Sequence, residues 1–194
     1  TWAVIRTDDL KRAVRLTAVY SAAHVVVILA VVAVPPRLFE ASSSYQTIVM
    51  AVHHEEFAAA LAPHLPGRML GAEGYGVACL LSFYNPGYFS NFEKGSWHGR
   101  QDDLITDWRE WAGRDAVIVC REPPDLEWYR AMFATVRVET IVVAGATFHL
   151  VLGEGFDFDA FRQRVLVPIV VRYYDVPSWL PMRQCWYRAR YFPQ

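Results

Sequence analysis

Three glycines, Gly71, Gly74 and Gly76, lie close together in the stretch GAEGYGVACLLSFYNPG (71–87), a spacing that would suit a phosphate-binding loop. A dinucleotide-binding loop, however, orders its glycines GxGxxG, and a P-loop ends in Lys followed by Ser or Thr. Here the order is GxxGxG, and no Lys-Ser or Lys-Thr follows. We therefore predict a tight strand-to-helix turn that needs a positive φ, with nucleotide binding as the alternative.

Histidines and carboxylates are also grouped at His53, His54, Glu55 and Glu56. Adjacent residues of a helix point in different directions, so at most a pair of these side chains shares a face. The zinc motif HExxH, which spaces its histidines four apart, is absent. The group is predicted to lie on a solvated helix face.

The most polar point of an otherwise apolar region is Arg100-Gln101-Asp102-Asp103, at a predicted loop-to-helix junction. Asp103 and Asp107 are four residues apart and share a helix face. Such a pair can do acid–base chemistry, but near a helix start it more often complements the helix dipole. We expect this junction to contact a ligand, and we predict no catalytic residue, metal ligand or cofactor in this chain.

Composition and cysteine usage exclude several classes of protein. The chain has 194 residues and a net charge of −1, which gives no electrostatic footprint for nucleic acid. Cys79, Cys120 and Cys185 are odd in number and widely spaced, unlike a disulfide framework or a CxxC metal site. They are predicted to be incidental thiols, with one disulfide as the alternative if the domain lies outside the cytoplasm.

Residues 16–34 (LTAVYSAAHVVVILAVVAV) carry no formal charge and are apolar all round, which predicts a transmembrane helix ending at Pro35-Pro36. A buried core helix and a cleaved signal peptide are the alternatives. Arg and Lys residues are enriched before the span, so the positive-inside rule places the N-terminal side in the cytoplasm and the rest outside. His24 within the span is expected to be a neutral imidazole hydrogen-bonded to another helix. The opening of the chain suggests the last span of a longer membrane protein.

The sequence after the span alternates between strand and helix patterns. A chain of this kind predicts an α/β fold in two parts. Residues 1–38 are a cytoplasmic amphipathic segment and the transmembrane helix, and 39–194 are a small, mixed-sheet, Rossmann-like extracytoplasmic domain, in which 157–194 is a tail of unassigned role. Helices are expected at 41–62, at 76–85, at 102–113 and from Asp125. The helix at 102–113 would place Leu104, Trp108 and Trp111 on its buried face. Strands are expected at 68–73, 88–92 and 115–122, at 138–155 as a hairpin about Ala144-Gly145, and at 165–174 as an edge strand.

The stretch 71–87 resembles the segment A(D/E)xYxxAxxLxFYxPG of bacterial polyprenyl-phosphate-dependent glycosyltransferases, the GT-C membrane enzymes of the family 39 type. The stretch GRQDDLITDWREWAGRDAVIVCRE (99–122) is similar to the polar loop, helix and strand that follow in that family. Gln101 and Asp103 match the loop, whereas Arg100 and Asp102 depart from its Asn and Tyr. The resemblance extends to about residue 156.

This resemblance implies a transferase that passes a sugar from a polyprenyl-phosphate carrier to a glycan, lipid or protein acceptor outside the inner (plasma) membrane. The family's catalytic acid lies in the first extracytoplasmic loop, in an N-terminal membrane domain that this chain lacks. The chain is therefore expected to be non-catalytic and to cap the active site, with Tyr75, Gln101 and Asp103 facing the substrate. The bilayer and the missing membrane domain are its expected partners.

Two other functions fit the residues. The first is a membrane-anchored extracytoplasmic ligand-binding or sensor module, with one helix as the anchor. The second is a soluble nucleotide-dependent enzyme.

Overall fold

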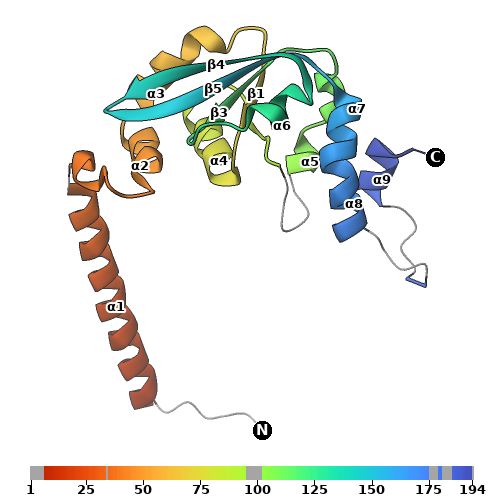
Figure 1. Ribbon diagram of the computed structural model, residues 1–194. Helices are drawn as coiled ribbons and strands as arrows, with labels where there is room; N and C mark the ends of the chain where they lie inside the picture. The colour runs from red at the N-terminus through yellow and green to blue at the C-terminus, as the bar shows by residue number, and fades with distance from the viewer. Residues whose placement is uncertain (1–6, 34, 95–101, 175–178, 181–184, 194) are drawn as a thin grey trace. The chain divides into compact units, whose positions relative to one another are not determined.

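The computed structural model describes residues 7–33, 35–94, 102–174, 179–180 and 185–193. The chain divides into two compact units, Thr1–Tyr45 and Gln46–Gln194. The long helix α1 belongs to the first unit and the β-sheet to the second (Figure 1).

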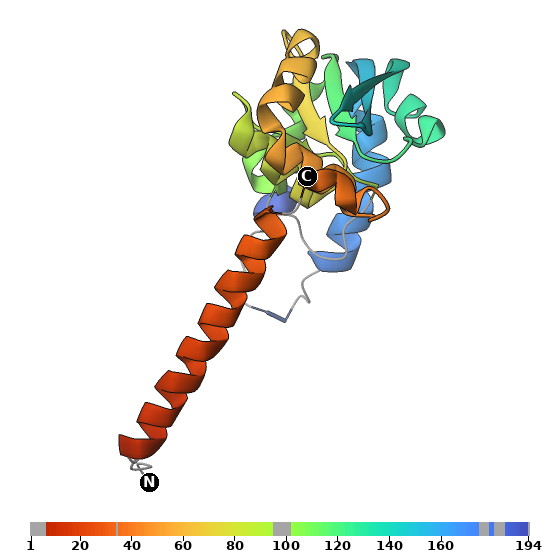
Figure 2. The ribbon, with the colours of Figure 1, turned by 90° about the vertical axis from the view of Figure 1, so that its left-hand side faces the viewer.

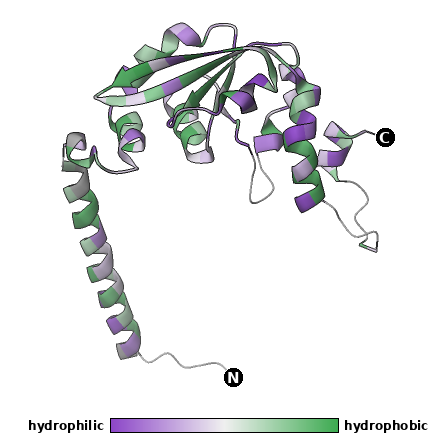
Figure 3. Ribbon diagram, viewed as in Figure 1, coloured by the Kyte–Doolittle hydropathy of each residue, from purple (hydrophilic) through white to green (hydrophobic). Residues whose placement is uncertain are grey.

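The first unit is built on one long helix, α1 (Thr7–Ala33), followed by the short 3-10 turn η1 (Pro36–Phe39). Large apolar side chains such as Leu16, Val19 and Leu29 are more than half exposed along α1, and its apolar character is plain in Figure 3. Asp9–Ala30 is long and apolar enough to cross a bilayer by length and composition. The helix predicted for 16–34 is therefore present, but it starts about two turns earlier.

The second unit contains a five-stranded mixed sheet in the order β2-β1-β3-β5-β4. β1 pairs in parallel with both β2 and β3, whereas β5 is antiparallel to β3 and to the edge strand β4. This confirms the predicted mixed α/β sheet with an antiparallel edge. The strands are β1 (Met69–Ala72), β2 (Ser90–Asn91), β3 (Ala116–Cys120), β4 (Phe133–Val143) and β5 (Ala146–Phe156).

Two predicted turns are confirmed by their backbone angles. Gly74, between β1 and the next helix, has φ +100°. Ala144 and Gly145, which join β4 to β5, have φ of +45° and +84°. Positive φ at both central residues is the geometry of a tight hairpin turn that matches the twist of the strands.

Helices cover both faces of the sheet. On one face, Phe57 of α3 meets Phe148 of β5 edge-on at 4.8 Å between ring centroids, and His54 of α3 stacks on Tyr84 of α4 at 4.2 Å. The elements here are α2 (Tyr45–Val52), α3 (His54–Leu61), the turn η2 (Ala62–His64) and α4 (Tyr75–Tyr84).

The opposite face holds an aromatic core centred on Phe92, whose ring neighbours those of Trp108, Trp111 and Phe161. Ala116, Ile118 and Cys120 of β3 belong to this core, as the two-residue period of a strand requires. Its helices are α5 (Asp102–Ile105), η3 (Trp108–Trp111), α6 (Leu126–Arg130), α7 (Phe158–Phe161), the π-helical turn η4 (Arg162–Leu166), α8 (Val167–Tyr173) and α9 (Trp186–Tyr191).

Three sequence predictions need correction. Residues 165–173 are helical and belong to η4 and α8; Pro168 lies in the first turn of α8, a position where proline is tolerated. The predicted helix 102–113 breaks at Asp107, which has extended φ/ψ and caps η3 through Arg109 N; Leu104 is consequently 43% exposed. The predicted helix 41–62 is interrupted at His53 and forms α2 and α3.

Candidate functional site

A polar crevice of about 390 Å³ lies where the three parallel strands end. Parallel strands present their carboxyl ends at one edge of a sheet, and each of these strands contributes residues that follow it directly. The crevice is lined by Glu73 and Gly74 after β1, Glu93 and Lys94 after β2, and Arg121, Glu122, Pro123 and Asp125 after β3.

The crevice opens because the chain leaves neighbouring strands toward opposite faces. After β1 it turns at Gly74 into α4, which contacts α3. After β3 it enters α6, whose Tyr129 ring stacks on Phe92 of the aromatic core at 5.9 Å. Ligands of open α/β sheets bind in crevices that form in this way.

Glu73 is a half-buried carboxyl in the lining of this crevice. Partial burial raises the pKa of its carboxyl, and the hydrogen bond from the Cys120 thiol and the charge of Lys94 oppose that rise only in part. Cys120 itself is fully buried, and its sulfur lies 3.4 Å from the Tyr129 hydroxyl. Burial also raises the pKa values of Cys120 and Tyr129, so both stay protonated at neutral pH. A cleft carboxyl with a perturbed pKa marks a candidate for proton transfer or ligand binding.

Two basic residues are held at the crevice by neighbouring elements. Lys94 forms an ion pair with Asp125, the N-cap of α6, and this pair lowers the pKa of the Asp125 carboxyl. Arg121 donates through Nη1 to Thr47 Oγ1 at 2.9 Å. These contacts fix the charged groups around the crevice before any ligand arrives.

We expect Glu73→Gln to stabilise the domain at neutral pH relative to the unmodified chain. The folded-state pKa of Glu73 is raised, so the folded state binds more protons than the unfolded state just above the ordinary pKa of 4.5. Ionised Glu73 therefore does not destabilise the folded domain at low pH, where the carboxyl is protonated. The destabilisation increases as pH rises from the ordinary pKa through the raised pKa of the folded state. Urea denaturation across this range should show the stability gain of Glu73→Gln increasing with pH; a constant gain would contradict the prediction. Glu122→Gln controls for removing a carboxylate from the exposed rim.

A second, more apolar pocket of about 290 Å³ lies beside α4. Tyr75, at the first turn of α4, and Tyr88, just before β2, are both partly exposed here, at 48% and 43%. Phe83 is also exposed. We call this the aromatic pocket; it is lined by Tyr75, Ala78, Cys79, Ser82, Phe83, Tyr88, Phe89 and Asp102.

Asp102 provides the polar end of the aromatic pocket. Its Oδ1 accepts a hydrogen bond from the Tyr88 hydroxyl, and its Oδ2 accepts from the Asn91 backbone N–H at 2.9 Å. Burial and the Asp102 carboxylate both raise the pKa of Tyr88, which therefore remains a neutral donor. The pocket joins apolar ring faces to a hydroxyl and a carboxylate.

The predicted substrate-contacting residues lie in different environments. Tyr75 is 48% exposed and lines the aromatic pocket. Asp103 is fully buried, and its Oδ1 accepts from Trp108 Nε1 at 2.8 Å. Gln101 lies outside the described residues. The structure thus brings Tyr75 together with Asp102, the neighbour of Asp103.

Sequence reasoning missed the pairing of Tyr88 with Asp102. Asp102 belongs to the polar junction Arg100-Gln101-Asp102-Asp103. The alignment of this junction with the family loop favours Asp103, because Asp102 departs from the family's residue. Tyr88 was assigned to a strand of alternating aromatics, and nothing in its local pattern indicates a partner 14 residues away.

The consecutive His53 and His54 make local contacts. His53 Nδ1 lies 3.6 Å from Glu56 Oε2, and His54 Nδ1 donates to the Ala51 carbonyl at 3.2 Å. Within the described residues, no group of three or more His, Cys, Asp or Glu side chains could hold a metal ion.

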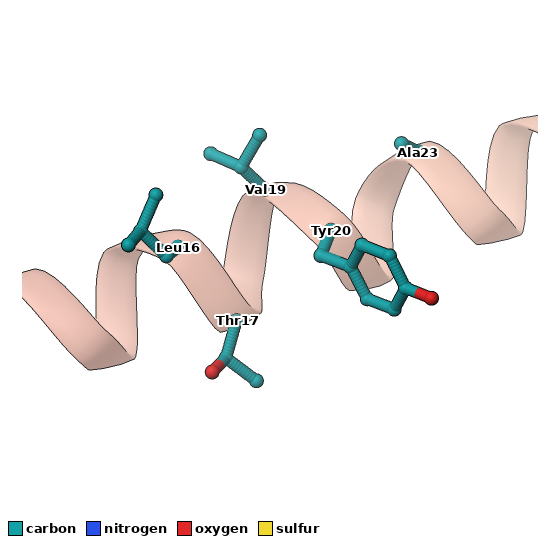
Figure 4. A pocket seen from close by; sticks show the side chains of 5 residues that line it. All are labelled: Leu16, Thr17, Val19, Tyr20 and Ala23. Atoms are coloured by element: carbon teal, nitrogen blue, oxygen red, sulfur yellow. The ribbon is translucent and has the colours of Figure 1, made fainter.

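A shallow hollow along α1 is lined by Leu16, Thr17, Val19, Tyr20 and Ala23 (Figure 4). All five belong to one helix, so the hollow is an open helix face. His24 next to it donates to the Tyr20 carbonyl at 3.1 Å. The hydrogen bond expected to another helix is thus made within α1 itself.

Comparison with known proteins adds no relative: no family model, curated protein or solved structure matches this chain.

Proposed function

We propose that the chain is the C-terminal part of a polyprenyl-phosphate-dependent membrane glycosyltransferase, and that its α/β domain binds sugar or acceptor groups in the aromatic pocket. One observation carries the proposal. The two separate segments on which the family resemblance rests, 71–87 and 99–122, both contribute to this pocket: Tyr75, Ala78 and Phe83 come from the first and Asp102 from the second.

The chemistry of the aromatic pocket suits a sugar ring. The apolar face of a pyranose packs on exposed aromatic rings such as Tyr75 and Tyr88, while its hydroxyls need nearby acceptors and donors. The Tyr88 hydroxyl and the Asp102 carboxylate are groups of this kind. In this proposal the aromatic pocket binds and orients the sugar. The catalytic acid would come from the membrane domain of the same transferase.

The long apolar helix α1 supports attachment to a membrane. The basic residues before it favour a cytoplasmic N-terminal side, which places the α/β domain outside the inner membrane in this proposal. Lipid-linked sugar donors would then reach a Rossmann-like domain that caps the transferase active site.

In the membrane protein that contains this chain, Tyr75→Ala is expected to lower sugar transfer about tenfold, equivalent to about 1.4 kcal/mol, because an exposed ring that holds the sugar face is lost. Transfer from a polyprenyl-phosphate sugar is measured in native membranes. Tyr84→Ala on the same helix is the matched control, since its ring stacks on His54 and lies outside the pocket lining. Equal transfer rates for both variants would contradict the proposal.

The polar crevice favours a second candidate, a membrane-anchored ligand-binding or sensor module. The coding DNA upstream of Thr1 separates the two. A reading frame that continues into many apolar spans, with an acidic residue in the first outer loop, supports the transferase. A start codon close to Thr1 supports the module.

A further inference from the structure

Charge is strongly segregated between the parts of this chain. Residues 39–159 contain seventeen acidic and eight basic side chains, a net charge of −9. Residues 160–194 contain six arginines and a single acid, a net charge of +5. A near-neutral total therefore hides a basic C-terminal segment, and charge asymmetry of this kind indicates an acidic partner.

The described part of the basic segment exposes both charges and apolar groups. Arg164, Pro168 and Arg172 are exposed at intervals of four residues along η4 and α8, beside Val171, which is 64% exposed. Farther along, Trp179 is 78% exposed. This surface therefore presents a tryptophan and a valine together with arginines.

The fold holds this surface in place. Tyr174, after α8, stacks on Tyr187 of α9 at 4.7 Å, so the two helices are neighbours. Tyr191 of α9 donates through its hydroxyl to the carbonyls of Asp103 and Thr106, at 3.0 and 2.8 Å. In Figures 1 and 2, α8 runs away from the sheet. Helices α8 and α9 of the basic segment are thus packed on the rest of the domain.

We propose that this C-terminal surface, formed by Arg164, Val171, Arg172 and Trp179, lies against the headgroups of an anionic lipid bilayer. Arginines attract an anionic surface, while tryptophan and long arginine stems enter the apolar edge of the headgroup region. The proposal is independent of whether the chain belongs to a glycosyltransferase.

A bilayer fits this surface better than a nucleic acid does. The exposed Trp179 and Val171 gain from an apolar environment that a phosphate backbone lacks. The same chain carries a helix that is long and apolar enough to cross a bilayer, and such a helix would bring a bilayer within reach of the domain.

The test uses the full chain in nanodiscs whose phosphatidylglycerol carries brominated acyl chains, which quench nearby tryptophan. The emission assigned to Trp179 is the difference between the unmodified chain and Trp179→Phe. We expect about half of this emission to be quenched in brominated phosphatidylglycerol discs, little in brominated phosphatidylcholine discs, and less quenching at about 1 M salt. Arg164→Glu with Arg172→Glu should remove most of it. Arg114→Glu with Arg130→Glu, at exposed positions elsewhere in the domain, should leave it intact.

Circular dichroism in the aromatic region confirms that each variant is folded. Equal quenching in the two lipids, or equal quenching with and without Trp179, would overturn the proposal. The Trp179 emission could instead depend on the number of chains per disc and not on the lipid. That result would assign the surface to the acidic part of a second copy and would also overturn the bilayer proposal.

Discussion

Replacing Phe92 by alanine is expected to lower the free energy of unfolding by about 3–5 kcal/mol, the usual range for a large aromatic in a core that cannot collapse. The Phe92 side chain is fully buried directly after β2. Its ring stacks near-parallel on Trp111 and Tyr129, at 6.0 and 5.9 Å between centroids. Because several rings meet there, their mutual packing prevents the cavity from closing.

Urea denaturation of the chain in detergent, followed by tryptophan emission, measures this loss. A domain of ordinary stability has a free energy of unfolding of about 5–15 kcal/mol, so a loss of this size removes a large part of it. Phe83→Ala is the matched control, since the Phe83 ring is 79% exposed and its loss should cost under about 0.5 kcal/mol. Similar losses for the two variants would show that Phe92 is not central to the core.

Replacing Asp103 by alanine is expected to destabilise the domain by about 1–3 kcal/mol, because a buried donor loses its acceptor. The Asp103 carboxylate has no solvent exposure and accepts from Trp108 Nε1 at 2.8 Å. Loss of sugar transfer in this variant would therefore reflect altered folding as much as lost contact with substrate.

A double-mutant cycle isolates the Asp103–Trp108 hydrogen bond. In a Trp108→Phe background, the indole N–H is already absent, and Asp103→Ala should cost about 1 kcal/mol less. Asp103→Asn, which keeps an oxygen acceptor, should be milder than the alanine variant. A cost that is the same in both backgrounds would show that the carboxylate stabilises the domain through other contacts.

Local patterns were enough to predict much of the sheet. The continuous apolar run at 115–122 became the buried central strand β3, and the turn at Ala144-Gly145 joins β4 to β5. Both signals depend on residues close in sequence, whose propensities act before tertiary contacts form. The stretch VLVPIVVRYY misled because its β-branched residues suit a strand, but its burial against the aromatic core is compatible with a helix.

The apolar span, the mixed α/β pattern and the glycine turn before α4 could be predicted from the amino-acid sequence. Each of these depends on hydrophobic length, periodicity or the freedom of glycine to adopt positive φ. In contrast, it is the packing of the folded domain that turns Asp102 toward the aromatic pocket and buries Asp103 against Trp108. Two adjacent carboxylates have the same chemistry in a sequence, and the short helix α5 turns them in different directions. The polar crevice likewise required the order of the strands, because Glu73, Lys94 and Arg121 become neighbours only when β1, β2 and β3 end at one edge.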